Sequence, residues 1–156
     1  MEPAYAVLMS PIGPLCLRAA GGQLRSLDIG AVDRPRETSD ALLREAVAQL
    51  SAWFEGQLTD FDLPLEPVTT PRGPAHRAAI AGIGYGETAS YGQIARMLGS
   101  SPRAVGQACA RNPLPIIIPC HRVLGAAGAI GHYSAGEGVA TKRWLLNHEQ
   151  THRKGR

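Results

Sequence analysis

Cys120 and His121 stand side by side in the stretch Ile-Pro-Cys-His-Arg-Val at residues 118–123. A cysteine attacks as its thiolate, and a neighbouring imidazole can accept the thiol proton, directly or through a water molecule. The imidazole can also lower the pKa of the thiol below its free value. The apolar run at residues 114–118 predicts a short buried segment, so we expect Cys120 at the floor of a pocket. The pattern predicts nucleophilic chemistry on one selected group.

The first half of the chain predicts a small sheet covered by one helix. Residues 5–29 contain short apolar runs separated by prolines and glycines, which is typical of hairpins with tight turns. Ser39 or Asp40 can cap the helix that follows, and Gly56 can end it. The expected apolar positions of this helix are Leu43, Val47, Leu50 and Phe54.

A proline-rich connection separates this half from the second. Residues 64–73 contain three prolines and two threonines, a composition typical of a domain boundary. We therefore predict an N-terminal domain at residues 1–68 and a C-terminal domain at residues 69–156. A helix at residues 75–83 is expected near the start of the second domain.

The second domain predicts a helix-turn-helix at about residues 90–112. Ser90 and Gln93 have the spacing of a capping box at a helix start, and Gly99 can end that helix. Ser101 can cap a second helix, which must stop before the proline that follows residue 112. Helix pairs of this kind also occur in all-helical cores, so the pair alone does not establish DNA binding.

Composition and charge narrow the class of protein. The 156 residues carry a net charge of +3, which permits a polyanionic partner without requiring one. Three cysteines match no disulfide framework, which indicates free thiols in a reducing compartment. No apolar run reaches about eighteen residues and no leader is visible, so we expect a cytoplasmic protein without a membrane span. Cys16 is the only cysteine of the N-terminal half and no histidine precedes His76, which predicts no metal site there.

Residues 112–123, Asn-Pro-Leu-Pro-Ile-Ile-Ile-Pro-Cys-His-Arg-Val, resemble the signature of the O6-alkylguanine-DNA alkyltransferases. Residues 103–106, 86–91, 133–134 and 142–149 resemble further parts of that family. The resemblance implies an α/β protein with a small RNase H-like N-terminal domain and a mostly helical C-terminal domain that carries the helix-turn-helix. It also implies DNA repair by a methylated-DNA–protein-cysteine methyltransferase that acts only once.

The resemblance implies a role for each residue of the reactive centre. Cys120 would attack the alkyl carbon on guanine O6 and keep the alkyl group. His121 would take the thiol proton through a water, and Glu149 would orient His121. Tyr91 would donate a proton toward guanine N3, and Asn112 would organise the turn around Cys120. No cofactor is implied, and a stable thioether makes each molecule a stoichiometric reagent.

The implied partner is double-stranded DNA that contains O6-alkylguanine, with O4-alkylthymine as a possible second lesion. The damaged nucleotide would rotate out through the minor groove, and Arg103 would fill the vacancy as an arginine finger. Tyr133 and Ser134 would line the flipped base. Residues that would contact the DNA or allow its close approach are Arg103, Ala104, Gly106, Gln107 and Arg122. We expect a monomer, with cooperative binding on DNA left open.

Several positions depart from the family pattern. Arg72 and Arg77 stand where relatives carry phenylalanine and tryptophan, and Gly84 replaces a proline. The loop at residues 98–103 is shorter than usual.

The basic end at residues 151–156 is expected to be frayed, with nonspecific phosphate contacts as one role.

Three other functions compete with alkyl transfer. Alkyltransferase-like proteins bind alkyl lesions on the same scaffold without removing them, but they usually lack the reactive cysteine. A Cys/His hydrolase or acyltransferase would need an oxyanion hole, for which no separate motif is visible. A helix-turn-helix regulator would need an effector domain, for which no residues are left over. Retention of Cys120 with His121, Tyr91 and Glu149 favours the alkyltransferase.

Overall fold

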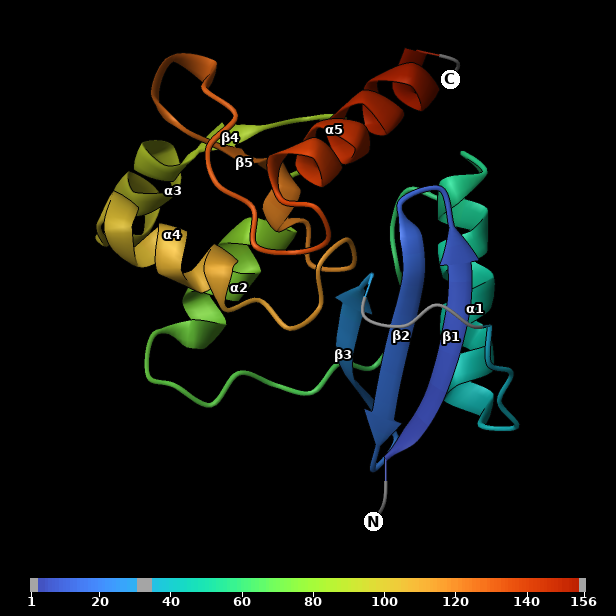
Figure 1. The fold of residues 1–156 in the computed structure, drawn as a ribbon. Coiled ribbons are helices and arrows are strands. Elements are labelled where there is room, and N and C mark those ends of the chain that lie inside the picture. The colour runs from blue at the N-terminus through green and yellow to red at the C-terminus, as the bar shows by residue number, and fades with distance from the viewer. Residues whose placement is uncertain (1–2, 31–34, 155–156) are drawn as a thin grey trace. The chain divides into compact units, whose positions relative to one another are not determined.

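The computed structural model describes residues 3–30 and 35–154. Residues 1–2, 31–34 and 155–156, which the two predicted domains include, lie outside the described residues. The chain divides between Glu66 and Pro67 into two compact units, and this boundary falls inside the proline-rich connection (Figure 1).

The first unit is an antiparallel sheet with one helix against it (Figure 1). Strands β1 (Ala4–Ser10), β2 (Gly13–Ala20) and β3 (Gln23–Ile29) lie in chain order, as the hairpin pattern predicts. Helix α1 (Ala41–Phe54) begins at Asp40, whose side chain accepts a hydrogen bond from the Leu43 amide at 2.9 Å. This sheet and its helix confirm the predicted α/β fold class.

The buried face of α1 differs slightly from the predicted one. Leu43 and Leu50 are buried as expected, but Ala46 and Trp53 are buried in place of Val47 and Phe54. The spacing of three, four and three residues keeps these four side chains on one side of the helix. From the sheet, the side chains of Ala6, Leu15, Leu17, Leu24 and Leu27 are buried in this unit.

The second unit is mostly helical and carries the predicted helix-turn-helix (Figure 1). Ser90 and Gln93 form the expected capping box, Gly99 ends the first helix in the left-handed conformation, and Ser101 caps the second. The second helix ends at Ala110, before the predicted end at residue 112. The helices are α2 (Gly73–Ala81), α3 (Tyr91–Leu98), α4 (Pro102–Ala110) and α5 (Val139–Lys154).

Short elements complete this unit around the reactive stretch. Strands β4 (Ala89–Ser90) and β5 (Val123–Leu124) pair in parallel. The 3-10 helix η1 (Cys120–Arg122) directly precedes β5, and η2 (Ala126–Gly128) follows it. The first helix of the unit, α2, begins two residues earlier than predicted because Pro74 is accommodated in its first turn, and it ends two residues earlier than predicted, at Ala81. Within the described parts of the chain, no helix has the length and apolar character needed to cross a membrane.

Candidate active site

The segment that leads to the cysteine is a buried turn. Residues 114–123 are all buried, and the apolar run predicts this for residues 114–118; they form turns and the 3-10 helix η1, and Val123 begins β5. Ile116 has a φ of 74°, in the left-handed region, which costs a β-branched residue about 1–3 kcal/mol. Asn112 braces this turn: its Oδ1 accepts from the Leu114 amide at 3.0 Å, and its Nδ2 donates to the Ile118 carbonyl at 2.9 Å.

Cys120 lies at the start of η1 with 5% of its surface exposed. Asn112 Nδ2 also donates to its Sγ at 3.2 Å. Burial raises the pKa of the thiol, while the Asn112 hydrogen bond and the charge of Lys142 act to lower it. In the resting site desolvation outweighs these favourable contacts. The cysteine rests as a thiol and needs a proton acceptor.

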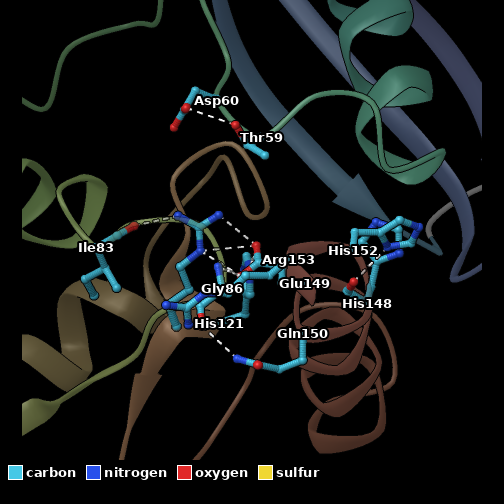
Figure 2. Close-up of polar contacts among 11 residues, drawn as sticks. Thr59, Asp60, Ile83, Gly86, His121, His148, Glu149, Gln150, His152 and Arg153 are labelled. Atoms are coloured by element: carbon cyan, nitrogen blue, oxygen red, sulfur yellow. Dashed lines mark hydrogen bonds and ion pairs between the residues drawn. The ribbon is translucent and has the colours of Figure 1, made fainter. Parts of the chain in front are cut away.

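His121 and Glu149 form a fully buried pair in the same unit. His121 Nε2 lies 2.8 Å from Glu149 Oε2, and the two side chains are 0% and 1% exposed (Figure 2). Burial lowers the pKa of His121 despite the carboxylate, which favours the neutral imidazole. Burial acts to raise the pKa of Glu149, but hydrogen bonds from His121 and Arg122 outweigh it and lower that pKa to about 2. Because a carboxylate only accepts, Nε2 carries the ring proton and Nδ1 holds the basic lone pair.

Arg122 belongs to this buried network rather than to a phosphate-binding surface. Its Nε and Nη2 donate to Glu149 at 2.7–3.1 Å, and its Nη1 donates to the Ile83 carbonyl at 2.6 Å. Only 5% of Arg122 is exposed. The prediction that Arg122 contacts DNA phosphates is therefore wrong for its side chain, because the guanidinium is already used to neutralise a buried carboxylate.

The turn before Tyr91 is connected to α5 by hydrogen bonds at Gly86. The Gly86 amide donates to Glu149 Oε1 at 3.2 Å, and its carbonyl accepts from Gln150 Nε2 at 2.7 Å and Arg153 Nη1 at 2.9 Å (Figure 2). Gly86 has a φ of 75°, and a Cβ there would lie 2.5 Å from Arg153 Cδ, so the position needs glycine.

The expected frayed end is wrong for residues 151–154, which continue α5; residues 155–156 lie outside the described residues.

Lys142 is a functional candidate that sequence analysis missed. It is 0% exposed, and its Nζ donates to the Val123 carbonyl at 2.6 Å and to the His132 carbonyl at 3.2 Å. Its charge acts to lower the pKa of Cys120. The sequence signal was its spacing from Leu145 and Glu149, which places all three on one face of α5.

Tyr91, the first residue of α3, lies close to Lys142 and to Gly131 in the loop that precedes α5. Lys142 Nζ is 5.8 Å from the centre of the Tyr91 ring, and a Cβ on Gly131 would lie 3.2 Å from the Tyr91 hydroxyl. Burial raises the pKa of Tyr91, and the charges of Cys109 and Cys120 add to that rise. The phenol therefore keeps its proton at neutral pH and can donate it.

The remaining predicted residues divide into buried and exposed groups. Tyr133 is 6% exposed, and its hydroxyl has no hydrogen-bond partner among the residues that the structure describes. Ser134 is exposed, and its Oγ donates to the Ala110 carbonyl at 3.3 Å. On α4, Arg103 and Gln107 are exposed, while Ala104 and Gly106 are half-buried. Over the described residues, no group of three or more histidines, cysteines or carboxylates could hold a metal ion.

Comparison with known proteins gives a consistent result over most of the chain. The ribonuclease-like domain of 6-O-methylguanine DNA methyltransferase matches residues 4–67, and the DNA-binding domain matches residues 75–151. A methylated-DNA–protein-cysteine methyltransferase of Mycobacterium leprae is 43% identical over 90% of this chain and 88% of its own. A Thermus thermophilus protein named DNA base-flipping protein is 38% identical over 91% of this chain and 97% of its own. The Mycobacterium tuberculosis OGT structure in complex with DNA has a TM-score of 0.80 at 40% identity, covering 95% and 93% of the two chains.

Proposed function

This chain belongs to the 6-O-methylguanine DNA methyltransferase family, and we propose that it repairs O6-alkylguanine in double-stranded DNA by transferring the alkyl group to Cys120. The observation that carries the proposal is a buried thiol that accepts a hydrogen bond and is followed directly in the chain by a buried histidine–carboxylate pair. Asn112 Nδ2 lies 3.2 Å from its sulfur, and the buried ion network of His121, Glu149 and Arg122 continues from the same 3-10 helix.

The first step is removal of the thiol proton. Neutral His121 is the base, because Glu149 holds the ring proton on Nε2 and leaves the lone pair on Nδ1. The proton passes to that nitrogen through a water. The resulting imidazolium is stabilised by the Glu149 carboxylate, while Asn112 and Lys142 stabilise the thiolate.

The second step is displacement at the alkyl carbon. The Cys120 sulfur forms a bond to this carbon as its bond to guanine O6 breaks, and the electron pair of that bond stays with the base. Tyr91 donates a proton toward guanine N3 and compensates the growing negative charge. The products are guanine and an S-alkyl cysteine, which no group in the site can cleave. One protein molecule therefore repairs one lesion.

Access to the lesion requires the nucleotide to leave the base stack. Unstacking costs a few kcal/mol, which contacts between the protein and the DNA must offset. Exposed Arg103 on α4 enters the minor groove and occupies the vacated position. Tyr133 and Ser134 line the flipped base, and Ala104, Gly106 and Gln107 face the groove. The same site would accept O4-alkylthymine only if the smaller base still reaches Cys120.

A non-catalytic lesion-binding protein is the second candidate. A relative that is 38% identical is named DNA base-flipping protein, and that name supports base rotation as a function for a chain of this kind. Cys120, braced by Asn112, favours chemistry instead.

A repair assay on the DNA separates the two candidates. Duplex DNA with a single O6-methylguanine is incubated with increasing protein, digested, and analysed for restored guanine. The proposal expects guanine to rise in proportion to the protein and to stop at one per molecule. Tight binding to the methylated duplex with no guanine formed would instead support lesion recognition alone.

A further inference from the structure

We propose that Arg72 and His76, at the start of α2, are positioning residues that aim the Arg103 side chain; this rests on the proposed role of Arg103 in nucleotide flipping. Arg72 Nη2 donates to the Leu98 carbonyl at 3.0 Å, and His76 Nε2 lies 2.9 Å from Ser100 Oγ. The first contact reaches the last residue of α3, and the second reaches the turn between α3 and α4. They span 26 and 24 residues of sequence, respectively, so they connect separate elements.

The contacts of His76 define its hydrogen-bonding direction. Its Nδ1 lies 2.9 Å from the Arg72 carbonyl, which can only accept, so Nδ1 carries the proton. In the neutral ring Nε2 is then an acceptor, and the Ser100 hydroxyl donates to it. His76 is 6% exposed, so this hydrogen bond is protected from competition by water.

The α3–α4 turn is short enough to pass this constraint on to Arg103. Only Gly99, Ser100 and Ser101 separate α3 from α4. The Ser100 amide donates back to the Ala95 carbonyl at 2.8 Å, and Ser101 Oγ accepts from the Ala104 amide at 3.1 Å. Arg103 is the second residue of α4, so the backbone of this turn sets the direction in which its side chain leaves the helix.

Within the described residues, no contact of its own fixes the direction of the Arg103 side chain. Arg103 is exposed, and across the described residues its guanidinium makes no hydrogen bond or ion pair. Its placement therefore depends on the position of α4 alone. A small rotation of the turn would displace the guanidinium by more than it displaces the backbone, because the side chain is long.

The other end of α2 connects to the reactive segment. The Ile83 carbonyl, two residues beyond α2, accepts from Arg122 Nη1 at 2.6 Å. Helix α2 packs against α3 and α4 (Figure 1) and also against η1. Helix α2 thus links the 3-10 helix that holds Cys120 to the turn that precedes α4, the helix that carries Arg103. We infer that the link sets the offset between the arginine that replaces the base and the cysteine that receives the alkyl group.

The test uses the ratio of two reaction rates. Ser100→Ala, Arg72→Ala and His76→Ala are compared on duplex O6-methylguanine DNA, which needs Arg103, and on free O6-benzylguanine, which does not. We expect the duplex rate to fall about fivefold to tenfold, the scale of one lost hydrogen bond, while the free-base rate changes less than about twofold. Ser100→Thr keeps the hydroxyl and should restore the duplex rate.

His152→Ala is the matched control, because His152 makes the same ring contact to the carbonyl four residues earlier, at 2.8 Å, without reaching the turn. It should leave both rates unchanged.

Equal losses on both substrates in the three variants, or no loss on the duplex, would overturn the positioning role. If the wild-type protein transfers no methyl group, the proposed function fails, and the variants are compared in duplex binding. There a fivefold weakening supports the link, and unchanged affinity overturns it.

Discussion

Glu149→Gln should cost the protein a large part of its stability, because it leaves a buried arginine without its counter-charge. The carboxylate is 1% exposed and accepts from His121 Nε2 and from Arg122 Nε and Nη2. Glutamine has almost the same shape but no charge. Removing one partner of a buried ion pair costs about 3–5 kcal/mol, since the remaining charge is desolvated and unpaired.

The pKa of Glu149 gives an independent magnitude. Burial opposes ionisation, but the hydrogen bonds from His121 and Arg122 lower the pKa from 4.5 to about 2. This interval corresponds to about 3 kcal/mol of stability. Because the folded-state pKa is the lower one, this contribution is complete above pH 4.5 and is lost as the pH falls toward about 2. The variant cannot show that loss.

Urea unfolding followed by circular dichroism, from neutral pH down to the lower pKa, measures both effects. At neutral pH the free energy of unfolding of Glu149→Gln should be about 3 kcal/mol below wild type, and the acid-dependent fall should be reduced by the same amount. Glu66→Gln is the control, because Glu66 pairs with Arg25 at 2.9 Å with both side chains nearly half exposed. It should cost less than about 1 kcal/mol. A loss below about 1 kcal/mol for Glu149→Gln, or equal losses in the two variants, would refute the reasoning.

Three further substitutions test other parts of the account. Lys142→Met should slow alkyl transfer about tenfold to a hundredfold, because the thiolate loses a nearby cation, and single-turnover rates on free O6-benzylguanine would show it. An unchanged rate would contradict its role. Tyr91→Phe should slow transfer about a hundredfold or more by removing the donated proton, and a rate near wild type in the same assay would exclude it as the acid. Asp40→Ala should lower unfolding free energy by about 1 kcal/mol through loss of the α1 cap, with alkyl transfer per folded molecule unaffected.

Local signals predicted much of the fold. The Asp40 cap and the Ser90–Gln93 capping box depend on residues three positions apart, so the sequence contains all of their partners. The hairpins follow from prolines and glycines that interrupt apolar runs. The end of α4 was predicted two residues too late, because helix ends depend on one or two hydrogen bonds.

Contacts between distant segments could not be predicted in the same way. Arg122 was assigned to DNA through the family resemblance, and nothing near it in the sequence indicates that its partner is Glu149, 27 residues later. Glu149 itself was assigned through the family resemblance alone. Burial of Lys142 and the left-handed backbone of Ile116 are also set by the packing around them. The reactive centre is built from such tertiary contacts, so less of it than of the fold could be predicted from the sequence.

The most direct test of alkyl transfer is the mass of the intact protein after incubation with excess duplex DNA that contains one O6-methylguanine. The account predicts a single methyl increment that saturates at one per molecule, maps to the peptide containing Cys120, and is absent from Cys120→Ala. An unmodified wild-type protein, or a methyl group on Cys16 or Cys109 instead, would contradict it.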